Sequence, residues 1–114
     1  MTLGELIAAL KQLDPSKVVS LGFGHPHSYR GYYDELAFEP QQNVTVGSML
    51  AAAQEALGAT YEGWKGGDYT MSDYTSCWLA EEGSTGETIG PLFLGLLLSD
   101  ASKPYQQVPD GQTP

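Results

Sequence analysis

The chain has 114 residues, of which 41% are hydrophobic and 17% charged, and its 14 acidic against five basic side chains give a formal net charge of −9. This length suits one domain with a single core and is too short for two. The acidic balance argues against general binding to nucleic acids or anionic membranes, because both need a basic surface. It is compatible with a surface suited to solubility or with mimicry of a polyanion.

Nothing in the sequence indicates export or membrane insertion. The single cysteine, Cys77, can form neither an internal disulfide nor a multi-cysteine metal site, and its apolar neighbours favour a buried side chain over a reactive thiol. Glu5 follows Met1 closely, and no basic segment of the signal-peptide type opens the chain. The apolar run at residues 92–98 is far shorter than the ~20 residues of a membrane span. We therefore expect a protein of a reducing cytoplasm.

The N-terminal segment predicts a capped helix followed by a strand. Thr2 and Glu5 have the spacing of a capping box, and apolar residues then recur at helical spacing over residues 3–13. The Asp-Pro-Ser sequence at residues 14–16 ends this helix, because the residue before a proline is driven out of the helical conformation. Residues 17–23 are typical of a strand.

A second strand and a second helix are predicted next. Residues 33–39 place Leu36 and Phe38 on one face and Glu35 and Glu39 on the other, as in a half-buried strand, and Pro40 closes this strand. A polar connector is expected at residues 41–44. Thr45 then caps a helix that Gly58 ends by adopting a left-handed conformation.

The remainder of the chain is typical of short strands and turns. We expect strands at residues 59–62 and 75–80, and turns at residues 63–68 and 81–86. The apolar run 92–98 predicts an element buried on both sides. Its periodicity does not separate strand from helix, and the flanking Gly-Pro together with an internal glycine favours a central strand.

These elements predict one α+β domain over residues 1–101, with two helices packed on one mainly antiparallel sheet. The tail at residues 102–114 contains three prolines and a glycine. We expect it to be flexible or disordered.

Residues 22–33 form the stretch with the densest chemistry. They contain four aromatic residues, both histidines of the protein and its only arginine, Arg30. A segment that only connects two strands is more typically short and polar. We therefore interpret this stretch as a binding loop.

Two cations, Arg30 and Lys65, lie in glycine-flanked aromatic turns. Arginine offers a planar fork for phosphate, successive glycine N–H groups can form an anion-binding nest, and aromatic faces can stack on a base. An acid such as Asp68 can accept from a ribose hydroxyl. Together these groups predict a nucleotide pocket. The predicted ligand-binding residues are His27, Ser28, Tyr29, Arg30, Trp64, Lys65, Gly66, Gly67, Asp68 and Tyr69.

A structural interpretation of the same residues is also open. In it, Arg30 pairs with Asp34 or Glu35 at the surface, and the aromatic residues fill the core beneath the loops.

Metal binding and catalysis have weaker support. His25 and His27 are spaced like a pair of metal ligands, but no third ligand stands at a recognisable spacing, and a non-metal role is favoured. Serine-hydrolase, Walker-type and His-Glu-x-x-His motifs are missing from the sequence. We expect no metal, no cofactor and no catalytic residue.

Four segments carry a resemblance to a known family: TLGELI at residues 2–7, SYRGYYxxLA at 28–37, VGxML at 46–50 and GWKGGDYTM at 63–71. Over about residues 2–98, the chain looks like small phage and prophage proteins. It resembles the Thoeris anti-defence proteins, which sequester cyclic ADP-ribose-type signals made by bacterial TIR-domain enzymes.

The resemblance implies a non-catalytic homo-oligomer of the host bacterial cytoplasm that binds its ligand at subunit interfaces. It would place Arg30 on the phosphate or base of the ligand and Tyr69 among the stacking residues. It also implies a second arginine towards the C-terminus, which this chain lacks, so that Lys65 would have to take its place.

Sequestration of a cyclic nucleotide, either a cyclic ADP-ribose isomer or a cyclic oligonucleotide, is therefore the predicted function. Two alternatives stay open. The charge of −9 is compatible with an acidic inhibitor that binds a host defence enzyme. The loop with His25 and His27 is compatible with a small nucleotide hydrolase.

Overall fold

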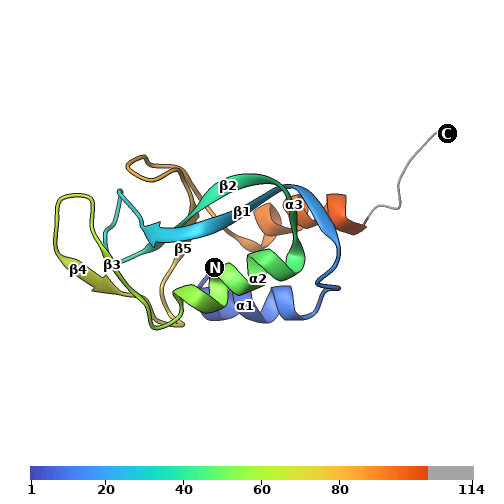
Figure 1. Cartoon of the computed structure of the whole chain (residues 1–114), viewed down its shortest axis with the longest axis horizontal. Helices are drawn as coiled ribbons and strands as arrows, with labels where there is room; N and C mark the ends of the chain where they lie inside the picture. The colour runs from blue at the N-terminus through green and yellow to red at the C-terminus, as the bar shows by residue number, and fades with distance from the viewer. Residues whose placement is uncertain (103–114) are drawn as a thin grey trace.

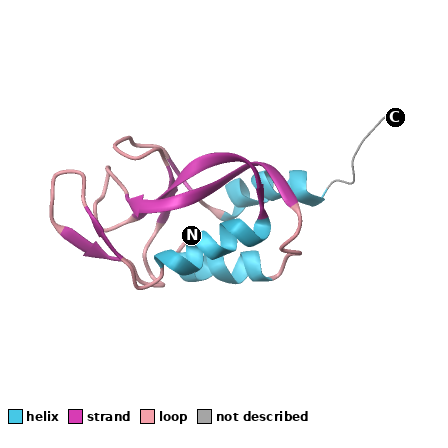
Figure 2. Cartoon of the chain, in the orientation of Figure 1, coloured by secondary structure: helices cyan, strands magenta, loops and turns pink. Residues whose placement is uncertain are grey.

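The computed structural model describes the backbone of residues 1–102 and the side chains of residues 1–99 (Figure 1). The predicted tail is residues 102–114, and only the backbone of its first residue is described. The described elements, shown by type in Figure 2, are α1 (Leu3–Lys11), β1 (Val18–Ser28), β2 (Leu36–Thr45), α2 (Val46–Ala56), β3 (Thr60–Glu62), β4 (Asp68–Thr70), β5 (Cys77–Leu79), β6 (Glu87–Thr88) and α3 (Pro91–Ser102).

The fold is of the α+β class, and its sheet is mainly antiparallel, as the sequence predicts. The central sheet has the strand order β1-β2-β5-β6, in which only the β2–β5 pair is parallel. β3 and β4 form a separate antiparallel hairpin. Helices α1 and α2 lie side by side under the β1–β2 ribbon, while α3 lies at the opposite end of the molecule from the β3–β4 hairpin (Figure 1).

Local capping signals determine where the first two helices begin. The Thr2 hydroxyl accepts from the Glu5 N–H at 3.2 Å, and the Glu5 carboxylate accepts from the Thr2 N–H at 2.9 Å, so that the predicted capping box is present. The Thr45 hydroxyl accepts from the Ser48 N–H at 3.0 Å. Gly58 follows α2 with a φ of 80° and is the predicted left-handed stop.

The core lies between these two helices and the sheet. The Phe23 and Phe38 rings, from β1 and β2, meet with centroids 4.8 Å apart. Cys77 is also fully buried, and burial raises the pKa of its thiol to about 12, which keeps it protonated near neutral pH. The prediction of a buried cysteine is therefore confirmed. Other fully buried side chains are Leu3, Leu6, Leu10, Val19, Leu36, Val46, Met49, Ala53 and Ile89.

β1 extends beyond its predicted end at residue 23, whereas β2 begins at Leu36 rather than at residue 33 and runs through the expected connector 41–44 to Thr45. Residues 22–28 of the expected loop continue β1, and the turn to β2 occupies only residues 29–35. Pro40 does not close the second strand, because it pairs with Phe23 inside β2. β5 accompanies β2 only as far as Phe38. Pro40 therefore lies where β2 has lost its second neighbour, and prolines are tolerated at such edge positions.

The prediction of a central strand at residues 92–98 is wrong, because this run belongs to α3. Pro91 takes the first helical position, where a proline needs no N–H partner, and the Gly90 carbonyl accepts from the Leu94 N–H at 2.9 Å. The run contains no β-branched residue that would favour a strand. It is also not buried on both sides, since Leu92 is 88% and Leu96 72% exposed.

As far as the described chain extends, it has no helix that is both long and apolar enough to cross a membrane.

Candidate functional site

A cleft opens between the C-terminal end of β1, helix α2, the β3–β4 hairpin and the loop at residues 81–86. It consists of a larger cavity of about 610 Å³ and a smaller one of about 280 Å³. The two cavities share three lining residues: His27, Glu62 and Glu82. Acidic and imidazole side chains are thus the main polar groups in the centre of the cleft.

A β-bulge positions the two histidines. The pairing of β1 with β2 shifts between Gly24 and Pro26, and His25 at this point has a φ of 49°, in the left-handed region. The two imidazole rings are 6.1 Å apart. Both face Glu39 of β2, whose Oε2 lies 3.6 Å from Nε2 of His25 and 3.9 Å from Nε2 of His27.

His27 is held in place by main-chain oxygens. Its side chain is only 8% exposed, with Nδ1 3.0 Å from the Ser28 carbonyl oxygen and Nε2 3.1 Å from the Ala80 carbonyl oxygen. Both ring nitrogens therefore face main-chain carbonyl oxygens, one on β1 and one just after β5. His27 therefore links β1 to the end of β5 and is a fixed part of the cleft wall.

Two of the predicted binding residues, Ser28 and Tyr29, are packing residues. The Ser28 hydroxyl is buried and donates to the Tyr33 carbonyl oxygen at 2.6 Å. The Tyr29 ring is 3% exposed and stacks on Trp78, with centroids 4.3 Å apart and an interplanar angle of 10°. The Tyr29 hydroxyl accepts from the Gly86 N–H at 3.1 Å. These contacts leave Tyr29 no open face for stacking on a ligand.

Arg30 meets the β3–β4 turn. Its Cζ lies 5.4 Å from the centroid of the Trp64 ring, which brings the two predicted binding segments together. No carboxylate of residues 1–99 forms a salt bridge with Arg30, so the alternative pairing with Asp34 or Glu35 is not present. Glu35 instead accepts from the indole N–H of Trp78. The Nε of Arg30 is buried and has no hydrogen-bond partner.

The glycine-rich turn is closed by its own main chain. Gly66 and Gly67 have φ values of 94° and 84°, which only glycine adopts without strain. The Gly66 N–H donates to the Gly63 carbonyl oxygen at 2.9 Å, and the Gly63 N–H donates to the Gly67 carbonyl oxygen at 2.8 Å. The Gly66 N–H is therefore used inside the turn, which weakens the prediction of an anion nest.

The other predicted residues of the hairpin are not gathered around Arg30. Lys65 and Asp68 are exposed, and within residues 1–99 neither forms an ion pair. The ring of Tyr69 is half-buried, 6.0 Å from the ring of Tyr33. The ten predicted residues come from two segments, residues 27–30 and 64–69. The contact between Arg30 and Trp64 joins these segments directly.

The loop at residues 81–86 also packs against Trp64. A Cβ placed on Gly83 would lie 2.7 Å from Cζ3 of Trp64, so only a glycine allows the indole to pack there. Gly83 also has a φ of 81°. The Trp64 side chain nevertheless remains 56% exposed, which leaves indole surface for a ligand.

A second buried polar atom without a hydrogen-bond partner belongs to Tyr61, a residue that lines the larger cavity. The Tyr61 hydroxyl has no hydrogen-bond partner, and it and Arg30 Nε are the two such buried side-chain atoms among the described residues. Burial, and to a smaller extent the charge of Glu55, raises the pKa of Tyr61. Buried polar atoms without partners are uncommon in native structures. Tyr61 lines the larger cavity, whereas Arg30 lines neither cavity and contacts Trp64, which lines the smaller one.

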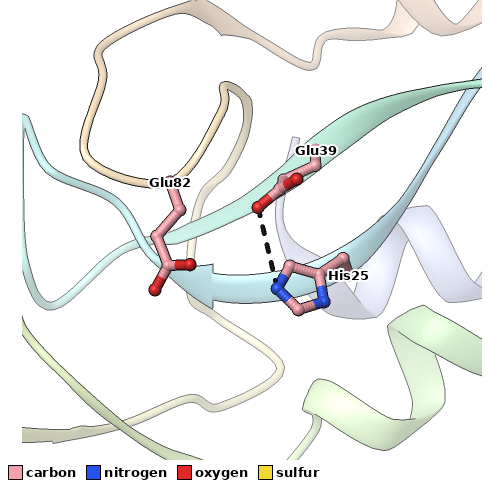
Figure 3. A group of neighbouring side chains, drawn as sticks. All are labelled: His25, Glu39 and Glu82. Atoms are coloured by element: carbon pink, nitrogen blue, oxygen red, sulfur yellow. Dashed lines mark ion pairs between the residues drawn. The ribbon is translucent and has the colours of Figure 1, made fainter.

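A group of possible metal ligands was missed from the sequence. His25, Glu39 and Glu82 each offer a ligand atom, and these atoms all lie within 4.8 Å of one another (Figure 3). Glu39 comes from β2 and Glu82 from the loop after β5. No rule of sequence spacing links Glu39 or Glu82 to the histidine pair, so the sequence alone does not reveal this group.

Comparisons of the chain with protein-family models, with curated proteins and with solved structures find no match. The functional argument therefore rests on the geometry of the cleft.

Proposed function

We propose that the protein is a non-catalytic phage anti-defence protein that binds and sequesters a small cyclic nucleotide signal in this cleft. The observation that carries the proposal is the placement of Arg30. The Arg30 guanidinium lies over the indole of Trp64, which is 56% exposed. Although the chain has a net charge of −9, Arg30 forms no salt bridge with any acid of residues 1–99.

The Arg30–Trp64 pair offers complementary surfaces to a nucleotide. The guanidinium can bind a phosphate through two parallel hydrogen bonds. The exposed part of the Trp64 indole can stack on a base, a contact that tolerates different bases. Phosphate and base would thus bind at neighbouring positions on one edge of the cleft.

The acids of the cleft favour one kind of nucleotide. Glu62 and Glu82 line both cavities, and carboxylates repel phosphate but accept hydrogen bonds from hydroxyl groups. A ligand with several ribose hydroxyls and few phosphates fits this distribution best. A cyclic ADP-ribose isomer is therefore favoured over a cyclic oligonucleotide.

The hydrogen bonds of His27 and Ser28 support binding without turnover. Both nitrogens of His27 face carbonyl oxygens, and the Ser28 hydroxyl donates to the Tyr33 carbonyl oxygen. Neither residue is arranged as a base or as a nucleophile. Sequestration needs no chemical step, because a binding protein in excess over the signal lowers its free concentration by mass action. This requires a dissociation constant on the order of nanomolar, or ~12 kcal/mol.

We further propose that the protein is a homo-oligomer whose copies meet through α3. Leu92 and Leu96 of this helix are 88% and 72% exposed, and residues 91–99 carry no charge. Exposed leucines one turn apart are typical of a helix covered by a partner. An uncharged surface also lets two acidic copies approach each other with little repulsion. Size-exclusion chromatography with light scattering tests this, with Leu92→Glu expected to yield monomers.

The nucleotide proposal is tested by titrating the protein with a panel of cyclic ADP-ribose isomers, ADP-ribose and cyclic oligonucleotides in a calorimeter. We expect Arg30→Ala to weaken binding of the best ligand by about 2 kcal/mol, roughly 30-fold, and to lower the free energy of unfolding by no more than ~1 kcal/mol, the size of its contact with Trp64. Lys11→Ala, which removes a cation from the last turn of α1, is the matched control and should bind as the wild type does.

Two outcomes would count against the proposal. Absence of binding by every member of the panel would remove the nucleotide as ligand. Equal binding by Arg30→Ala and by the wild type would place the pocket elsewhere.

A further inference from the structure

The group formed by His25, Glu39 and Glu82 has a charge distribution that calls for a cation. Two carboxylates have oxygens within 4.8 Å of each other, and within residues 1–99 neither forms a salt bridge with a lysine or arginine. The ion pairs recorded for Glu39 are with the imidazoles of His25 and His27. Unlike a patch of surface acids, this group includes a nitrogen ligand of a different chemical type.

The three side chains come from separate elements and converge on one point. Figure 3 shows His25 on β1 and Glu39 on β2 pointing toward each other, with Glu82 approaching from the loop after β5. The bulge that gives His25 its φ of 49° determines where this imidazole points. His25 and Glu82 also line the larger cavity, so an ion held between them has access from solvent.

Small movements would complete a coordination sphere. Ligand atoms of a tetrahedral zinc ion at 2.0–2.2 Å stand about 3.4 Å apart. The atoms here lie within 4.8 Å, and their side chains can rotate, because the His25 side chain is 59% and the Glu39 side chain 30% exposed. His27 is not needed as a ligand, since its Nε2 is bound to the Ala80 carbonyl oxygen.

We infer that His25, Glu39 and Glu82 form a site for one divalent transition-metal ion of the zinc class. One imidazole and two carboxylates suit Zn²⁺, whereas Mg²⁺ and Ca²⁺ prefer oxygen ligands alone. Three protein ligands leave the fourth tetrahedral position to water or to a bound ligand. The inference does not rest on the nucleotide proposal, because it uses neither Arg30 nor Trp64.

The site is tested with tag-free protein that has been treated with a chelator and then titrated with Zn²⁺ in a calorimeter. Absorption spectra with Co²⁺ report the coordination geometry independently. We expect one Zn²⁺ per chain, visible-region Co²⁺ bands of tetrahedral type and no saturable binding of Mg²⁺. A rise in the unfolding temperature with added Zn²⁺ should accompany binding.

Variants separate a built site from general attraction by acids. Glu82→Gln should weaken Zn²⁺ binding at least tenfold, whereas Glu81→Gln, the same charge change one residue earlier, should stay within twofold of the wild type. His25→Asn should also weaken binding at least tenfold. Asparagine is chosen because it tolerates a positive φ and so preserves the bulge.

The inference is overturned if the wild type shows no saturable Zn²⁺ binding. It is also overturned if Glu81→Gln and Glu82→Gln weaken binding equally, since the attraction would then be diffuse. If His25→Asn binds Zn²⁺ as tightly as the wild type does, and circular dichroism shows an intact fold, then His25 is not a ligand and the proposed ligand set is wrong.

Discussion

The two sides of the cleft that meet at Arg30 and Trp64 are built in different ways. The β1 side, at residues 27–30, is anchored by a buried histidine, a buried serine and the Tyr29–Trp78 stack. The β3–β4 side is a two-stranded hairpin whose turn bonds to itself and whose Trp64 is 56% exposed.

The difference shows how such a cleft combines rigidity with adaptability. The β1 side fixes the direction from which Arg30 emerges, because its neighbours are part of the packed interior. The hairpin side has few buried contacts, and segments of this kind open most readily. Substitutions of the packed residues on the first side should therefore change stability, while substitutions of Arg30 and of the exposed Trp64 should chiefly change binding.

The largest effect on stability is expected from Tyr29→Ala on the β1 side. Removing a ring that is 3% exposed and stacked on Trp78 should lower the free energy of unfolding by about 3 kcal/mol. Urea denaturation measures this loss. Tyr74→Ala, at a tyrosine that is 83% exposed, is the matched control and should change stability by no more than ~0.5 kcal/mol. Equal losses in the two variants would show that the β1 side is not the rigid one.

The stability of α1 and α2 depends on signals that are local in sequence, and for this reason both helices could be predicted. Thr2 bonds with Glu5 and Thr45 with Ser48, each three residues on, and Gly58 ends α2 through its own φ of 80°. Residues 92–98 could not be assigned in this way, because an all-apolar run suits either element and only its surroundings decide. Pro91 before the run and the lack of β-branched residues within it are the local signs of a helix.

The cleft was predictable only where composition singled out a residue. Arg30 and Trp64 stand out as the only arginine and one of two tryptophans. Tyr29 has the same sequence context as Arg30, yet its ring is buried against Trp78. Glu39 and Glu82 look like ordinary surface acids, and their approach to His25 arises from the pairing of β1 with β2 and the path of a distant loop.

An intermediate effect is expected from Gly83→Ala, which alters the contact between the 81–86 loop and the hairpin. The φ of 81° makes alanine unfavourable by about 1–2 kcal/mol, and the new methyl group would also push on the Trp64 ring. Gly66→Ala is a close control, because its φ is 94° but no atom lies within 4 Å of the added Cβ. Both variants should lose similar stability in urea denaturation.

Tryptophan fluorescence distinguishes the two variants. Only Gly83→Ala should shift the emission and weaken nucleotide binding, since only there is the indole displaced. A shift of the same size in Gly66→Ala would mean that the whole turn responds to strain and that Gly83 has no special role beneath Trp64.

The smallest effect on stability is expected from Trp64→Ala on the hairpin side. The indole is 56% exposed, and its contact with Arg30 is of a kind that contributes about 0.5–1 kcal/mol at an exposed site. The free energy of unfolding should therefore fall by no more than ~1 kcal/mol. Binding of the best nucleotide should fall by 1 kcal/mol or more, because a stacked base contributes ~1–3 kcal/mol. Calorimetry and urea denaturation on the same preparation give both values. A loss of stability close to that of Tyr29→Ala, with unchanged binding, would reverse the roles assigned here to the two sides of the cleft.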